Sequence, residues 1–284
     1  MIEKELARYF TGLSDYWRSI YIDKPKPWDF FHHHAVIKRK DAVINFVAHV
    51  TNGTKQKILD AGCGTGMIMA ELLEQGHMVF GLELSDAMAK EAHRNLSSRG
   101  FDDVDIRIGS IQSSGYGNGI FDTTLCIGVL QYLDTDEKAL RELTRITKTN
   151  GHIILSLPNI FRVTTLTDPY YYIRRAPFFL FTKTNGKKKM ESKITPDDIL
   201  YNKTFINRRY YHGQIKKLCR QLGLEYKGER PIGYGPLTFW RKECLPRNCV
   251  INFANMLERL ACTRLFSWLT FFADRWVILL QKVH

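Results

Sequence analysis

The sequence lacks the features that cross-link a chain or anchor it in a membrane. None of its six cysteines falls in a C-x-x-C pair, and no histidine is spaced with them as a zinc site requires. The longest apolar stretches, such as Leu265–Ala273, are far shorter than a bilayer span. The first ten residues contain acids and no apolar run, so no signal peptide is expected. We therefore predict a cytoplasmic protein without a metal site, soluble or peripheral to the membrane.

Acidic residues are also scarce, and the formal net charge is +12. Residues 160–220 contain fourteen Lys and Arg but only four Asp and Glu, so most of the excess lies in one stretch. Such a stretch attracts anions, and the candidate partners are nucleic acid, an anionic membrane and an acidic substrate. A solvated surface without a partner is the alternative.

The apolar pattern alternates between short buried runs and helical periods, which predicts an α/β fold with a parallel sheet and helices on both faces. A helix over residues 36–50 precedes the first strand. The predicted strands are Lys57–Ala61, Met78–Glu83, Val104–Ile108, Phe121–Ile127, His152–Leu157, Leu224–Arg230 and Trp276–Leu280. The predicted helices between and after them are Gly66–Gln75, Asp86–Arg99, Asp136–Lys148, Tyr210–Leu222 and an amphipathic piece over Asn248–Phe272.

This pattern divides the chain into four parts. Residues 1–50 form an aromatic, helical N-terminal cover, and residues 51–158 form the core. Residues 159–205 are basic and aromatic, and they are predicted to be an insertion or lid after the fifth strand. Residues 206–284 complete the core sheet and carry the amphipathic helical piece.

A glycine loop follows the first strand. Gly62, Gly64 and Gly66 stand at alternate positions, where the backbone turns tightly and a ligand can approach it. The G-x-G-x-x-G spacing of a dinucleotide site is absent, and no Gly-Lys-Ser/Thr of a phosphate-binding loop follows. Asp60 instead lies two residues before the first glycine, where a carboxylate repels a pyrophosphate and attracts an ammonium group. Glu83, at the end of the second strand, suits a ribose diol. Together these residues predict an amino-acid nucleoside as the ligand.

The segments ILDAGCGTG (residues 58–66) and GLELSDAM (residues 81–88) resemble motifs I and post-I of class I S-adenosylmethionine (SAM)-dependent methyltransferases. The resemblance covers roughly residues 55–160 and is highly specific in the glycine loop. It implies a Rossmann-like seven-stranded, mostly parallel sheet, closed by an antiparallel strand that Trp276–Leu280 supplies. It also implies SAM as the cofactor and S-adenosyl-L-homocysteine (SAH) as the product.

The same resemblance assigns expected roles to single residues. Asp60, Gly62, Cys63 and Gly64 would line the methionine part of SAM, and Glu83 would hold the ribose. Leu84 and Met88 would flank the adenine, and Ile127 and Gly128 would approach the sulfonium. The family usually places an acid after the third strand to accept from the adenine amine. Gly109-Ser110-Ile111-Gln112 stands there instead, so Ser110 is expected to bond the adenine and Ile111 to pack on it.

Several methyltransferase classes do not fit. Amino methylation typically uses a D/N-P-P-Y/F/W motif after the fourth strand, where this chain has Ile127-Gly128-Val129-Leu130. A Pro-Cys nucleophile for cytosine-C5 methylation is absent, because Cys126 follows Leu125. A catechol-type metal site would need more acids than Asp134 and Asp136 in that region. A small or lipid-like acceptor remains the favoured substrate, with a hydroxyl oxygen as the expected accepting atom.

The aromatic leader resembles the N-terminal cover of methyltransferases that act on quinone precursors and magnesium-protoporphyrin. Tyr16 and Trp17 are therefore added to the predicted cofactor-binding residues, since a cover excludes water from the sulfonium. The basic insertion is expected to contact an anionic membrane or a lipid-like acceptor. If a base is needed, the candidates are His32, His33, His34, Tyr132 and His212. Two alternatives stay open: an RNA or protein methyltransferase that docks through the basic insertion, with nucleic acid the less favoured partner, and a scaffold that binds SAM without turnover.

Overall fold

The computed structural model describes residues 2–21, 30–163, 167–169, 208–235, 238–239, 242–243 and 245–283. Within these residues, no helix is long and apolar enough to span a bilayer. The helices are α1 (Ile2–Gly12), α2 (Ser14–Tyr21), α3 (Phe30–Thr51), α4 (Met67–Glu74), α5 (Asp86–Ser97), η2 (Leu130–Tyr132), α6 (Asp136–Ile146), α10 (His212–Gln221), α11 (Arg247–Ala261) and η3 (Ser267–Phe272). The strands are β1 (Lys57–Ala61), β2 (Met78–Glu83), β3 (Ile106–Ile108), β4 (Phe121–Ile127), β5 (Thr147–Pro158), β6 (Leu224–Ile232), β7 (Thr238–Phe239), β8 (Lys242–Glu243) and β9 (Arg275–Lys282).

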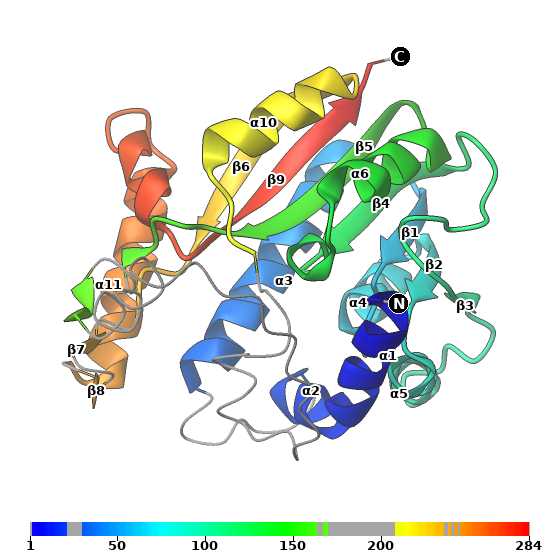
Figure 1. Cartoon of the computed structure of the whole chain (residues 1–284), viewed down its shortest axis with the longest axis horizontal. Coiled ribbons are helices and arrows are strands. Elements are labelled where there is room, and N and C mark those ends of the chain that lie inside the picture. The colour runs from blue at the N-terminus through cyan, green and yellow to red at the C-terminus, as the bar shows by residue number, and fades with distance from the viewer. Residues whose placement is uncertain are drawn as a thin grey trace, which may run out of the picture.

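Seven of these strands form one twisted sheet in the order β3-β2-β1-β4-β5-β9-β6 (Figure 1). The first five pair in parallel, whereas β9 runs antiparallel to both β5 and β6. The sheet reverses its strand order between β1 and β4, which is the point at which open α/β sheets bind ligands. The predicted seven-stranded, mostly parallel sheet with an antiparallel closing strand is confirmed.

Each face of the sheet buries its own hydrophobic core. Helices α3, α4 and α5 cover one face, with Val43, Met69 and Leu96 packed against β-strand residues such as Leu125. Helices α6 and α10 cover the other face, where Leu143 and Ile215 join a second core. Alternate residues of one strand therefore face different helices. On β1, Ile58 belongs to the α3 side and Leu59 to the α6 side.

Most element boundaries lie within two residues of the predicted ones, and three regions differ more. Helix α3 begins at Phe30 rather than near residue 36. Strand β5 begins at Thr147, five residues before the predicted start, because Asn150 adopts a φ of 63° and the pairing with β4 shifts register there. A bulge thus keeps residues 147–151 in the sheet. The predicted amphipathic piece over 248–272 is two helices, α11 and η3. Most of the predicted insertion over residues 159–205 lies outside the described residues.

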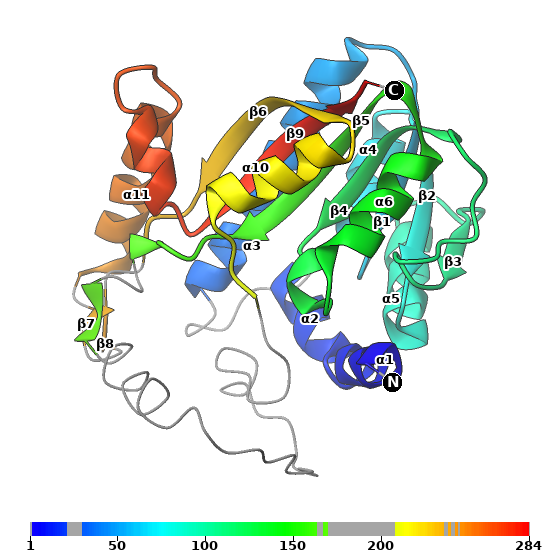
Figure 2. The same cartoon turned by 45° about the horizontal axis from the view of Figure 1, so that its top comes forward.

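The N-terminal helices lie at the edge where the parallel strands end (Figure 2). Leu6 of α1 is buried in the core, and the Phe10 ring meets the Tyr132 ring of η2 edge-on at 5.2 Å. Thr11 Oγ1 lies 3.0 Å from Ser85 Oγ, which also accepts a hydrogen bond from the Met88 amide at the start of α5. The leader therefore packs over the loops that follow β2 and β4.

Candidate active site

The glycine loop between β1 and α4 adopts the left-handed backbone that its sequence predicts. Gly62, Gly64 and Gly66 have φ values of 86°, 58° and 73°. The Gly62 amide donates to the Leu82 carbonyl at 2.6 Å, which fixes the loop to the end of β2. A Cβ on Gly62 would lie 2.2 Å from the Val129 Cγ2 atom. The loop therefore has no room for a side chain at its first glycine.

Asp60 lies near the end of β1 with its side chain buried to 2% exposure. No hydrogen-bond donor among the described residues reaches its Oδ1 atom. Burial, followed by the neighbouring Glu83 charge, raises the pKa of Asp60 to about 7, and Arg39 opposes this rise. A buried carboxylate oxygen without a donor requires one. The site thus has a place for a cationic donor.

Glu83 stands at the end of β2, on the other side of the loop. Its carboxylate accepts hydrogen bonds from the backbone amides of Gly64, Leu84 and Ser85, at 2.9, 2.9 and 3.0 Å. These three donors hold it in one orientation, while burial raises its pKa. A carboxylate fixed in this way still has lone pairs with which to accept from a diol.

Side chains around the loop are apolar and close-packed. Cys63 and Met88 are both buried, and burial raises the pKa of the Cys63 thiol, which keeps it neutral. The Met88 Cε atom lies 3.6 Å from the position of a Cβ on Gly64. Leu84 is partly buried beside this group. Met88 therefore lies against the glycine loop, and the cofactor-binding roles of these residues remain predictions.

The segment after β3 has a polar partner that the sequence did not reveal. Ile111 is buried, and Ser110 Oγ hydrogen-bonds the Glu3 carboxylate of α1. An acid from the N-terminal helix thus lies beside the segment after β3, where the sequence has none. No local signal could have identified Glu3, since 107 positions separate the two residues.

Gly128 follows β4 and meets an arginine from α3. Its φ is 75°, and a Cβ there would lie 2.8 Å from the Nη1 atom of Arg39. Arg39 is only 7% exposed, and its charge acts on Asp60. Ile127, the last residue of β4, is buried in the core on the α3 side. The glycine at this position lets a guanidinium approach the end of β4.

Of the three adjacent histidines, His32 packs against the aromatic residues of α2. Its Nδ1 atom is 2.9 Å from the Tyr16 hydroxyl, and its ring meets Trp17 edge-on at 5.6 Å. Burial, then the positive charges of Arg275 and Arg39, lower its pKa to about 3. His32 is therefore neutral at neutral pH and lies among positive charges.

The other candidate bases have different surroundings. His33 Nδ1 lies 2.6 Å from the Ile20 carbonyl. Burial, then the charge of Lys38, lower the pKa of His34, and Glu258 and Asn255 of α11 oppose this shift. His212 hydrogen-bonds Glu229 of β6, and its ring lies tilted against the Trp276 ring of β9. The structure therefore does not bring His212 to the glycine loop. Tyr132 lies on η2 just after Gly128, where its ring meets the Phe10 ring edge-on.

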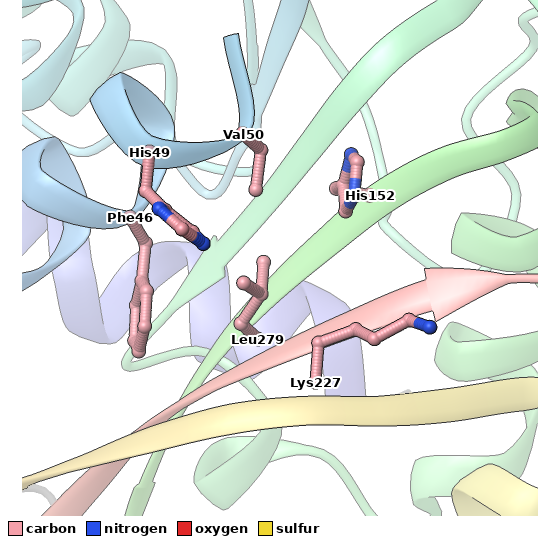
Figure 3. A pocket seen from close by; sticks show the side chains of 6 residues that line it. All are labelled: Phe46, His49, Val50, His152, Lys227 and Leu279. Carbon is pink, nitrogen blue, oxygen red and sulfur yellow. The ribbon is translucent and has the colours of Figure 1, made fainter. Parts of the chain in front are cut away.

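A separate cavity of about 320 Å³ lies toward the amino ends of the strands. Figure 3 shows His49 of α3 and His152 of β5 beside it, with Lys227 of β6 along its floor. His152 pairs with Thr123 near the start of β4, whereas Gly128 follows the end of that strand. This cavity therefore belongs to the opposite edge of the sheet.

The residues at the carboxyl edge fit an amino-acid nucleoside. Asp60 has an unsatisfied oxygen for an ammonium group, and Glu83 is held rigidly for a diol. The left-handed glycines leave the backbone open between them. SAM carries all three of the required parts: a cationic amino acid, a ribose and a purine.

Known proteins agree with this interpretation. Residues 59–155 match the methyltransferase domain family model. The chain is 29% identical to malonyl-[acyl-carrier protein] O-methyltransferase of Erwinia pyrifoliae, over 44% of this chain and 46% of that protein. It is 22% identical to ubiquinone biosynthesis O-methyltransferase of Vibrio campbellii, over 74% of this chain and 80% of the relative.

A solved structure extends the similarity in fold to nearly the whole chain. Magnesium protoporphyrin IX methyltransferase from Synechocystis, with bound SAH, superposes with a TM-score of 0.65 at 16% identity, over 99% of this chain and 100% of that one. The domain match, the strand order and the fit of the site to SAM point to one conclusion: this chain carries a SAM-dependent methyltransferase domain with the class I fold.

Proposed function

We propose that this enzyme transfers the methyl group of SAM to an oxygen atom of a small or lipophilic acceptor. The observation that carries the proposal is the unsatisfied, buried Asp60 oxygen opposite Glu83. The two curated relatives described above are both named O-methyltransferases, which supports oxygen as the accepting atom. We expect a hydroxyl group on the acceptor.

The cofactor supplies an electrophilic methyl group when bound, and the protein aligns it. Asp60 would hold the amine of SAM, and Glu83 the ribose hydroxyls. Arg39, close to Asp60 and to Gly128, is placed for the α-carboxylate of the methionine part. Glu3 would accept from the adenine amine beside Ser110. Holding the reacting groups in line accounts for most of the rate that such a displacement needs.

His32 and Tyr16 are the pair that we propose for proton removal from the acceptor. Their hydrogen bond of 2.9 Å orients the imidazole. Burial and the charges of Arg275 and Arg39 lower the pKa of His32 to about 3, so an anionic group on the acceptor is needed to offset these charges and strengthen the base. His33 is engaged with the Ile20 carbonyl, which makes it the weaker candidate. Tyr132 remains a second candidate because it follows Gly128 closely.

Two measurements test this function. Calorimetric titration with SAH should show binding, and Asp60→Asn should lose most of it. Turnover is then followed as SAH formed from SAM in the presence of a panel of phenols and hydroxylated lipids. His32→Gln should lower kcat by about a hundredfold with the SAH affinity unchanged, and His33→Gln should lower kcat less. Failure of the wild-type protein to bind SAH would refute the proposal.

A finer part of the proposal concerns the membrane. The α11–η3 segment exposes five large apolar side chains, and the exposed Arg259 and Arg264 lie among them. Apolar groups mixed with cations suit the surface of an anionic bilayer. The five apolar residues are Phe253, Met256, Leu265, Trp268 and Phe271.

Vesicle flotation tests this contact. The wild-type protein should float with vesicles that contain phosphatidylserine, and the double variant Leu265→Ser, Trp268→Ala should not. Met78→Ser is the matched control, since Met78 is 61% exposed at the amino end of β2. Equal flotation of all three proteins would rule out this surface.

A further inference from the structure

Arg275 lies at the same sheet edge as the cofactor site, although it is remote from it in sequence. It begins β9 and pairs with Pro158 at the end of β5 and with Ile232 at the end of β6. Side chains alternate along a strand, and Val277 and Leu279 face the core on the α3 side. Arg275 therefore points toward α3, the helix that carries His32 and Arg39.

Positive charge accumulates around this side chain. Burial, then the charge of Arg39, lower the pKa of Arg275 to about 10, and Arg162 acts in the same direction. Asp274 acts against this shift. Among the described residues, none of the ion pairs includes Arg275. A partly buried guanidinium without such a pair suits an anionic ligand.

The cofactor accounts for only part of this charge. SAM has a single carboxylate, and Arg39 is placed for it because it lies beside Asp60, the partner proposed for the amine. Arg275 also acts on His32, whose pKa it lowers more than Arg39 does. A carboxylate on the acceptor would supply an anion for Arg275.

We propose that the methyl acceptor carries a carboxylate that binds Arg275, while its accepting oxygen faces His32. This inference rests on the proposed function and names the substrate class for the same site. Arginine presents a planar fork of donors that a carboxylate matches with two hydrogen bonds. The Tyr16 and Trp17 rings beside His32 provide an apolar surface for the body of the acceptor. The predicted substrate is an aromatic or aliphatic acid with a hydroxyl group, rather than a neutral phenol.

Binding rather than turnover provides the test. The SAH-loaded protein is titrated with 4-hydroxybenzoate, 4-hydroxycinnamate and 12-hydroxydodecanoate, each against its neutral amide, by ligand-observed NMR. Phenyl phosphate serves as a further arm that distinguishes a phosphate from a carboxylate. At least one acid should bind about tenfold more tightly than its amide. Arg275→Gln should remove this preference, Arg275→Lys should retain part of it, and Arg264→Gln, an exposed arginine, should leave it unchanged.

SAH affinity and the melting temperature are measured for every variant. Unchanged SAH binding by Arg275→Gln together with loss of the acid preference would support the proposal. Equal binding of acids and amides to wild-type protein, preference for phenyl phosphate alone, or binding of none of the probes would overturn it and leave the proposed function intact. Loss of SAH binding in Arg275→Gln would also overturn it, since Arg275 would then serve the cofactor or the fold. Failure of wild-type protein to bind SAH would instead count against the proposed function.

Discussion

At the scale of single residues, Asp60 connects cofactor binding to pH. Its pKa of about 7 arises mainly from burial, so much of the carboxylate is protonated in neutral solution. In the ligand-free protein, a raised carboxyl pKa stabilises the fold below the ordinary value of 3.8, and this stabilisation is lost as pH rises through 7. A bound cation reverses the preference, because it favours the ionised form.

We therefore predict that SAH affinity rises between pH 6 and pH 8 and then levels off. Asp60→Asn should abolish the slope and weaken binding by about 2 kcal/mol, which is about thirtyfold in Kd. Calorimetric titration at four pH values checks both effects. A slope of equal size in the variant would assign the pH dependence to another group.

Gly62 provides a second test at this scale. Replacement by alanine forces a side chain into a left-handed backbone and against Val129, and we expect a loss of about 3 kcal/mol in unfolding free energy. Gly100→Ala is the matched control, since Gly100 has a φ of 84° and open space around it. It should lose about 1 kcal/mol. Urea denaturation measures the unfolding free energy of both variants. Equal losses would show that the Val129 side chain can move aside without destabilising the fold.

Arg39 shows what a single sequence could and could not reveal. It lies on the same face of α3 as Val36, Val43 and Val47, all of which are buried. A charged residue on the apolar face of a helix indicates that this face covers a polar site. The glycine loop and Glu83 were predictable because their chemistry is local. Arg275 and Glu3 were not, because only the tertiary fold brings them to this edge.

At the scale of elements, α1 and α5 share one serine. Ser85 caps α5 by accepting from the Met88 amide, and its hydroxyl also meets Thr11 of α1. The cap itself was predictable from the sequence, whereas the contact with α1 was not. The bulge at Asn150 was not predictable either, because the register between β4 and β5 depends on both strands.

This sharing predicts unequal effects of two substitutions. Ser85→Ala should cost about 1 kcal/mol for the lost cap and somewhat more for the lost contact with α1. Thr11→Val removes only that contact, and we expect about 0.5 kcal/mol. The double variant should be no less stable than Ser85→Ala alone. Thermal denaturation of the three proteins checks this, and fully additive losses would mean that the two hydroxyls do not interact.

At the scale of the whole molecule, the site joins strands from the two halves of the chain. The glycine loop, the residues that follow β4 and helix α3 all lie within residues 30–130, whereas Arg275 belongs to β9. Ligand binding should therefore stabilise the entire sheet. SAH at a hundred times its Kd should add about 2.7 kcal/mol, which corresponds to about 5 °C in melting temperature.

The matching control is NAD at the same concentration. Its pyrophosphate would face the Asp60 carboxylate, so no upward shift is expected. Differential scanning fluorimetry with both ligands separates the two classes of nucleotide. An equal shift with NAD would contradict the preference for a cationic ligand.

The position of β9 also has a consequence for synthesis. This strand lies between β5 and β6 in the sheet, yet residues 275–282 are translated after all the other strands that the structure describes. Until they leave the ribosome, the backbone amides and carbonyls along one side of β5 and β6 have no neighbour to pair with. Such unpaired strand edges invite association between nascent chains. The growing polypeptide thus exposes these strand edges until residues 275–282 have been synthesised.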